Sequence, residues 1–267
     1  MKRFFSGLKE AYLKDKAVFF VYVLLRITVI AVAVMEGLRA DYQGLFYCIL
    51  TLVLLMLPSF VEKRFKVELP TGLEITVLVF IFAAEILGEL GCYYLKVPHW
   101  DTMLHTINGF VCAAIGFSLV DILNRDAKIK FTLSPVFMAV VAFCFSMTVG
   151  VLWEFFEFAG DNLLGMDMQK DTVINVIRSV ELNPESKNVP VVIDNIRTVT
   201  VNGVDLGLGG YLDIGLYDTM KDLIVNFIGA VVFSVIGFFY IKKRGKGKFA
   251  RQFIPTLSDE DVKKGEE

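Results

Sequence analysis

Residues 218–241 read DTMKDLIVNFIGAVVFSVIGFFYI, and this stretch decides the class of fold. Its charged residues lie in the first turns, and none follows Asp222. An α-helix of about 20 apolar residues is long enough to cross the hydrocarbon core of a bilayer. The stretch therefore predicts a membrane-spanning helix whose first turns are polar.

Five further stretches have a similar length and apolar character. Of the 267 residues, 55% are hydrophobic, more than a soluble domain usually contains. Only helices and closed barrels satisfy backbone hydrogen bonds in lipid. We therefore predict an all-α fold, a polytopic membrane bundle of about six transmembrane helices. The predicted spans are residues 17–35, 43–60, 73–95, 100–123, 133–158 and 219–241.

The number of Lys and Arg residues alternates between low and high from one predicted short loop to the next. The first and third loops hold one basic residue each, Arg39 and Lys96, whereas both termini and the other short loops hold several. Cytoplasmic loops carry the excess of Lys and Arg. We therefore expect a bacterial cytoplasmic (inner) membrane protein with its N- and C-termini in the cytoplasm. The basic residues are Lys2, Arg3, Lys9, Lys14, Lys16, Lys63, Arg64, Lys66, Arg125, Lys128, Lys130, Lys242, Lys243, Arg244, Lys246 and Lys248.

The longest loop is predicted to form an extracytoplasmic cap. It contains Thr198-Val-Thr-Val followed by Asn202-Gly203, a strong signal for a tight β-hairpin. A net charge of −2 gives no basic surface for nucleic acid, so we expect membrane lipids as partners instead. The predicted parts are helices one to five in 1–159, the cap in 160–217, helix six in 218–244 and a basic-then-acidic cytoplasmic tail in 245–267.

Ionisable and amide side chains gather at one end of four predicted spans. At 1.5 Å per residue, they share a layer roughly 0–15 Å below the outer helix ends. Spacings of three, four or seven residues place those of each span on one stripe. Charges inside a bilayer cost about 2.5–3.5 kcal/mol each and mark functional sites. The residues are Glu85 and Glu89; Asp101, His105 and Asn108; Glu154, Glu157 and Asp161; and Asp218, Asp222 and Asn226.

So many carboxylates in one layer cannot all stay ionised without a counter-charge. A divalent metal, Mg²⁺, Mn²⁺, Fe²⁺ or Zn²⁺, would neutralise them and suits one His with several carboxylates. Protonation of some carboxylates and a broad, wet cavity are the alternatives, and Asp101 and Asp218 also suit helix N-caps. The predicted catalytic bases are Glu85 and Glu89, and the predicted metal ligands are Asp101, His105, Glu154, Glu157, Asp218, Asp222 and Asn226.

Three segments resemble known families of bacterial membrane proteins. They resemble the YjdF-type inner-membrane proteins and are distantly similar to the VanZ-like family, whose pattern is Asp-x3-His, Glu-x2-Gln and Asp-x3-Asn-x2-Gly. Glu157 departs from that pattern, because Gln is expected there. The resemblance implies a membrane protein with a polar site, without a defined reaction. The segments are His99-Trp-Asp101-Thr-Met-Leu-His105, Trp153-Glu-Phe-Phe-Glu157 and Asp218-Thr-Met-Lys-Asp222-Leu-Ile-Val-Asn226-Phe-Ile-Gly229-Ala.

Three functions fit this pattern. The first is a metal-dependent enzyme acting on an envelope lipid or lipid-linked substrate, with a carboxylate as general base. The second is a proton- or cation-coupled transporter, and the third is a non-catalytic envelope receptor or assembly factor. The sequence favours the enzyme over the transporter, because transport sites usually lie nearer the midplane between inverted repeats, and no such repeat is visible.

Overall fold

The computed structural model describes residues 12–125, 133–243 and 245–257. Among the predicted cytoplasmic basic residues, Lys2, Arg3, Lys9, Lys128, Lys130 and Arg244 lie outside these ranges, as does the acidic end of the tail, 258–267. The chain forms two compact units, residues 1–150 with 225–267, and residues 151–224. These units are defined by contacts between residues. The four parts predicted from the sequence (1–159, 160–217, 218–244 and 245–267) are defined by position relative to the membrane, and they stay a prediction.

Five helices of the described residues are long and apolar enough to cross a membrane. They coincide with five of the six predicted spans, and the prediction of a polytopic helical membrane fold is confirmed. The helices are α2 (Lys16–Arg39), α3 with α4 (Tyr42–Leu54 and Leu57–Phe65), α7 (Trp100–Arg125), α8 (Pro135–Leu164) and α9 (Leu216–Lys242).

The third predicted span, 73–95, has an irregular backbone. Helix α5 (Thr71–Phe82) continues directly into the π-helix η1 (Ala83–Leu90), and α6 (Tyr93–Lys96) follows a turn. Together α5 and η1 have the length that a crossing needs, about 20 residues. The sequence predicted the span but not the π-helix.

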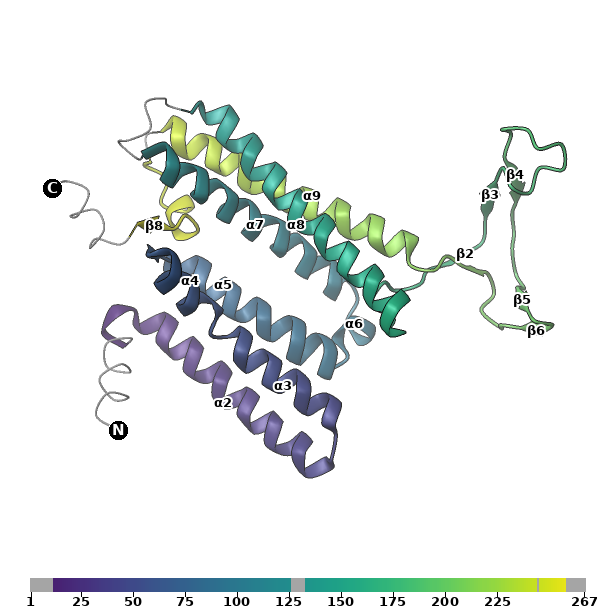
Figure 1. The fold of residues 1–267 in the computed structure, drawn as a ribbon, viewed down its shortest axis with the longest axis horizontal. Helices are drawn as coiled ribbons and strands as arrows, with labels where there is room; N and C mark the ends of the chain where they lie inside the picture. Colours follow the sequence, from purple (N-terminus) through teal and green to yellow (C-terminus); the bar gives the residue numbers. More distant parts are fainter. Residues whose placement is uncertain (1–11, 126–132, 244, 258–267) are drawn as a thin grey trace. The chain divides into compact units, whose positions relative to one another are not determined.

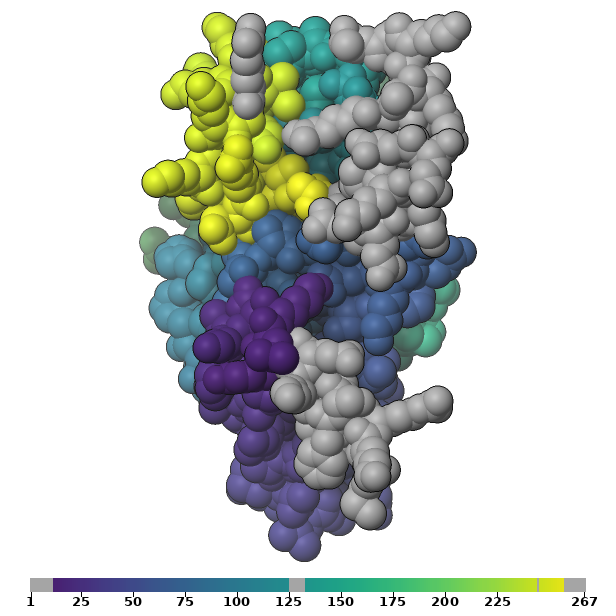
Figure 2. Space-filling view, turned by 90° about the vertical axis from the view of Figure 1, so that its left-hand side faces the viewer, coloured from purple at the N-terminus to yellow at the C-terminus, as the bar shows by residue number. Residues whose placement is uncertain are grey.

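A pair of short strands joins the segment before α5 to the C-terminal segment. Strand β1 (Val67–Glu68) pairs antiparallel with β8 (Thr256–Leu257). Figure 2 shows the C-terminal segment, in yellow, against the blue segment that begins α5. Paired strands lie on one side of a membrane, so an even number of crossings separates them. Helices α7, α8 and α9 are three candidate crossings between the two strands, and the predicted span at 73–95 would be the fourth.

Two apolar clusters form the core of the first unit. One joins α2, α3, α5 and η1, which are packed together, and Figure 1 shows α2, α3 and α5 side by side. The other joins α7, the first half of α8, the second half of α9 and the C-terminal segment. Many of its members are small, which lets membrane helices approach closely. Its buried residues are Ala113, Ala114, Phe117, Met138, Ala142, Ala230, Phe233, Tyr240, Ala250 and Ile254.

The second unit contains the long loop, which holds three antiparallel strand pairs. The predicted hairpin is confirmed: its turn residues Asn202 and Gly203 have φ angles of 54° and 83°. Positive φ at both central positions defines the turn type that joins two-residue hairpins. The pairs are β2 (Val173–Ile174) with β7 (Tyr211–Leu212), β3 (Ile177–Ser179) with β4 (Val191–Ile193), and β5 (Thr200–Val201) with β6 (Val204–Asp205).

Candidate metal-binding site

The first turns of α7 hold two of the predicted ligands. His99 has a φ of 62°, so the chain turns there and α7 begins at Trp100. Asp101 lies in the first turn, where the helix dipole favours negative charge. Nε2 of His105 lies 3.4 Å from Oδ1 of Asp101, and these side chains are 11% and 26% exposed. The two therefore form a mostly buried pair that α7 positions by itself.

One turn further along, the backbones of α7 and α9 touch. A Cβ atom added at Gly109 would lie 2.1 Å from the carbonyl oxygen of Asn226, and one added at Gly229 would lie 2.1 Å from that of Thr106. The Ser146 hydroxyl of α8 donates to the Gly109 carbonyl at 2.7 Å. Glycine is required at both positions, because any side chain would push the two helices apart.

The amide of Asn226 fixes the register at this contact. Its side chain is 1% exposed. Its Oδ1 accepts a hydrogen bond from Nδ2 of Asn108 at 3.3 Å, and its Nδ2 donates to the Ser146 carbonyl at 3.4 Å. Gly150 makes room for it, since a Cβ there would lie 2.7 Å from Nδ2. Asn226 thus joins three helices through an amide network, which is the role of polar side chains between membrane helices.

Asp222 lies one turn before Asn226 on the continuous helix α9 and is 1% exposed. Helices α7 and α9 run in the same direction, because Phe110 contacts Phe233 and Phe117 contacts Gly237 further along both. One ligand atom each from Asp101, His105 and Asp222 lie within 4.8 Å of one another. We call these three residues the metal group.

A cation already lies near this group. Nζ of Lys221 is 3.8 Å from Oδ1 of Asp222 and 3.5 Å from Oδ1 of Asp218. These distances allow attraction but are too long for good hydrogen bonds. Oδ2 of Asp218 accepts the backbone N–H of Lys170 at 2.8 Å. Asp218 therefore ties the loop to the beginning of α9.

The acidic residues of α8 have contacts of their own in the second unit. Glu154 and Glu157 are 5% and 8% exposed. Oε1 of Glu157 accepts a hydrogen bond from the Trp153 indole at 2.7 Å. Asp161 accepts the backbone N–H groups of Met168 and Gln169 at 2.5 and 2.9 Å, which holds the start of the loop. The metal group does not include Glu154, Glu157, Asp218 or Asn226, and their assignment as ligands stays a prediction.

Glu85 and Glu89, the predicted catalytic bases, lie on the π-helix η1. Glu85 is half-buried and Glu89 is exposed. Glu89 lies within hydrogen-bonding reach of the Tyr47 side chain on α3, the helix against which η1 packs. A π-helix has a wider turn than an α-helix, and residues four apart still lie on nearly the same side of it. Their catalytic role stays a prediction, although π-helical turns are frequent at functional sites.

Sequence reasoning missed the close approach of α7 and α9. Gly109 follows His105 by four residues and Gly229 follows Asn226 by three, so each glycine continues a polar stripe. A glycine that continues a polar stripe could have indicated this close helix contact. Nothing in the sequence indicated that Ser146 and Gly150 contact Asn226.

The chain belongs to the family described as predicted membrane protein (DUF2238), which it matches over residues 21–243. This range includes all the predicted site residues. The chain is also similar to a protein of Thermotoga maritima described as an uncharacterized protein, with 28% identity over 127 residues, 45% of this chain and 62% of the relative. The chain thus spans less than two thirds of that relative. No solved structure is significantly similar, and the resemblance to YjdF-type and VanZ-like proteins stays a prediction.

Proposed function

We propose that this protein is a metal-dependent membrane enzyme that acts on an envelope lipid or lipid-linked molecule. The supporting observation is the metal group, with one imidazole nitrogen and two carboxylate oxygens in reach of one ion. Three protein ligands are typical of catalytic zinc sites, which keep a position open for water or substrate, whereas structural sites have four. A mixed nitrogen and oxygen set favours Zn²⁺, Fe²⁺ or Mn²⁺ over Mg²⁺.

The chain supplies the ligands and a dry setting for the reaction. A divalent cation held there would make a coordinated water more acidic, with a pKa of about 7 in the case of Zn²⁺, and would polarise carbonyl or phosphoryl oxygens. Asp101 and His105 hold each other in place on α7. Asp222 is fixed by α9, whose register the Asn226 network sets. A site of low dielectric strengthens each of these interactions.

The orientation of the chain supports a substrate in the outer leaflet. Nζ of Lys14 lies 2.8 Å from Oε1 of Glu62, and β1 pairs with β8. The N-terminal segment, the second loop and the C-terminal segment therefore share the end that is rich in Lys and Arg. We place this end in the cytoplasm, which puts the metal group towards the outer leaflet. Alkaline phosphatase should be active when inserted near residue 188 and inactive at the C-terminus, and the reverse pattern would contradict this orientation.

The close helix contact argues against transport through this site. The backbones of α7 and α9 touch at Gly109 and Gly229, one turn beyond the metal group. An ion could pass between these helices only if they separated and broke the Asn226 network. A receptor or assembly factor would need neither bound metal nor turnover. Metal binding together with turnover would therefore favour the enzyme over those functions.

Metal content of the purified full-length protein tests the proposal. The wild-type protein should hold bound metal, and His105→Ala and Asp222→Asn should lose it. Asp218→Asn, on the same helix but outside the metal group, should keep it, as should Asp205→Asn, which makes the same charge change in exposed β6. Equal metal content in all five proteins would overturn the metal site.

Turnover needs a separate measurement. Envelope lipid extract incubated with the wild-type protein should yield a product that mass spectrometry detects. The Asp222→Asn variant should yield none. Identical product spectra for the two proteins, with metal bound to the wild type alone, would refute the enzymatic part and leave the metal site standing.

A further inference from the structure

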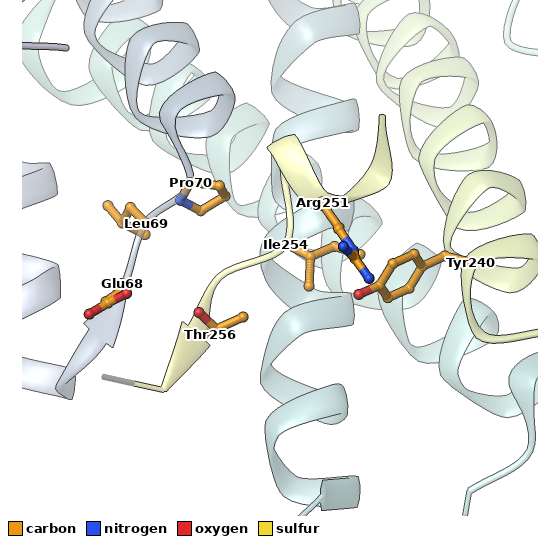
Figure 3. Close-up of a pocket in the computed structure, with 7 residues that line it drawn as sticks. All are labelled: Glu68, Leu69, Pro70, Tyr240, Arg251, Ile254 and Thr256. Atoms are coloured by element: carbon orange, nitrogen blue, oxygen red, sulfur yellow. The ribbon is translucent and has the colours of Figure 1, made fainter. Parts of the chain in front are cut away.

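A cavity of about 380 Å³ lies at the end of the first unit that we place in the cytoplasm, next to the end of α9, whereas Asp222 lies near the beginning of that helix. One wall is the segment from β1 to the start of α5, and the other is the C-terminal segment with the end of α9 (Figure 3). The lining combines charged, hydroxyl and apolar groups. The lining residues are Glu68, Leu69, Pro70, Tyr240, Arg251, Ile254 and Thr256.

Tyr240 presents a hydroxyl to this cavity from a buried ring. The residue is 8% exposed, and its ring lies edge-on to Phe117 with the centroids 6.4 Å apart. The loop after α9 lies against this side chain, because a Cβ atom added at Gly247 would lie 3.4 Å from the ring atom Cδ2 and one added at Gly245 would lie 3.4 Å from the hydroxyl oxygen. The hydroxyl makes no hydrogen bond with any of the residues that the structure describes. The hydroxyl is not among the fully buried polar atoms and lines the cavity, so a ligand there can reach it.

Arg251 provides a charge next to that hydroxyl. Its Nε donates to the Gly245 carbonyl at 2.9 Å, which holds the guanidinium in place. Figure 3 shows the terminal guanidinium nitrogens directed towards the Tyr240 hydroxyl. Within the described part of the chain, Arg251 forms no ion pair with a carboxylate. A planar guanidinium with free N–H groups binds phosphate through two parallel hydrogen bonds.

Glu68 lies on the opposite wall. It is exposed on β1 and stands opposite Thr256 in the register of the strand pair. Figure 3 shows Glu68 and Arg251 on opposite walls of the cavity, with Leu69 next to Glu68 and Ile254 next to Arg251. The cavity thus has a cationic wall and an anionic wall, each with an apolar side chain beside the charge.

We propose that this cavity binds a zwitterionic headgroup that carries a phosphate and a primary ammonium group, as in phosphatidylethanolamine. Arg251 and Tyr240 would bind the phosphate, and Glu68 would bind the ammonium group. The cavity lies where α9 ends and α5 begins, at the membrane surface, and exposed Lys242 and Lys243 end α9 there. The inference goes beyond the proposed enzymatic function and shares with it only the membrane orientation.

Lipid retention by the purified full-length protein tests this site. Native mass spectrometry would compare protein from nanodiscs of phosphatidylcholine doped with phosphatidylethanolamine or with phosphatidylglycerol. We expect the ethanolamine lipid to be retained. Arg251→Gln should weaken its binding by at least about 10-fold, because it removes charged hydrogen bonds, and Tyr240→Phe by about 5-fold. Lys248→Gln is the matched control, since it removes a charge from an exposed residue of the same segment that does not line the cavity.

Three comparisons decide the outcome. Equal lipid retention by Arg251→Gln and Lys248→Gln would overturn the site. Glu68→Gln should abolish the preference for ethanolamine over glycerol headgroups, and an unchanged preference would overturn the zwitterionic assignment. Soluble phosphoethanolamine, added as a competitor, shows the source of the ligand: displacement of the lipid indicates that the headgroup alone is recognised, and retention indicates the membrane lipid. Metal content should be the same in all these variants, which separates this test from that of the metal group.

Discussion

Replacement of Gly229 by alanine tests whether the contact between α7 and α9 builds the metal group. The added Cβ would lie 2.1 Å from the Thr106 carbonyl oxygen and 2.8 Å from the Phe110 backbone nitrogen. Ordinary contacts of this kind begin at 3.4 Å, so the helices must move apart locally by about 1.3 Å, the difference between 3.4 and 2.1 Å. Both neighbours are backbone atoms, and neither can turn away as a side chain could.

A shift of this size exceeds what a metal site tolerates. Ligand distances in protein metal sites hold to within about 0.2 Å. Asp222 lies two turns before Gly229 on the same rigid helix, so it should move away from Asp101 and His105. We expect metal affinity to fall by at least about 10-fold, the lower end of what lost ligand orientation costs. Overpacking should also destabilise the protein by about 1–3 kcal/mol.

Gly37→Ala is the matched control for this experiment. Gly37 lies near the end of α2, and no atom lies within 4 Å of a Cβ added there. The control should keep its metal and gain up to about 1 kcal/mol, because alanine loses less entropy than glycine in a helix. Equilibrium dialysis with metal analysis measures the affinity, and thermal unfolding in detergent measures the stability. Wild-type metal affinity in Gly229→Ala would refute the idea that this spacing positions the ligands.

Three further predictions concern the ends of the bundle and the loop. The Thr71 hydroxyl and backbone N–H groups donate hydrogen bonds to the Asp15 carboxylate before α2 and lower its pKa below the ordinary value of 3.8. The ionised carboxylate therefore stabilises the fold fully above pH 3.8. This stabilisation is lost as the pH falls through the lowered pKa of the folded protein. Asp15→Asn should therefore flatten the stability profile below about pH 5, and parallel profiles would contradict this. Gly203→Ala should open the β5–β6 hairpin, because φ is 83° there, and should speed proteolysis of the loop relative to Gly37→Ala; equal cleavage rates would count against it. Deletion of residues 185–205 should reduce turnover while the variant still inserts into the membrane. Failure of this variant to insert would argue against a separate cap.

Much of the fold could be predicted because the signals are local. A bilayer demands long apolar helices, so each span can be read from its own residues, as in 218–241. The Asn202-Gly203 turn was equally local, since both residues adopt positive φ readily. The π-helix η1 and the pairing of β1 with β8 could not be read in this way. The π-helix lies against α3, a contact that its own residues do not reveal, and the strand pair joins Val67 to Leu257, 190 positions further along the chain.

The candidate site divides along the same line. Helical spacing predicted that Asp101 and His105 share one stripe and that Asp222 and Asn226 share another. From the sequence, the polar residues of four helices form one predicted group, because a helix reveals how deep its residues lie in the membrane but not which helices lie beside it. The structure separates them: Asn226 bonds Asn108 and Ser146, Asp161 and Asp218 hold the loop, and Glu89 meets Tyr47.

The sequence alone determined that this chain is a multi-pass membrane protein with polar helix ends, because hydropathy and helical period act within one segment. Only the tertiary structure decided that Asp101, His105 and Asp222 lie within reach of one ion. That choice rests on Gly109 and Gly229, where two backbones approach more closely than any side chain would allow. Distances between helices depend on which residues happen to face each other, and a single stretch of sequence does not contain that information.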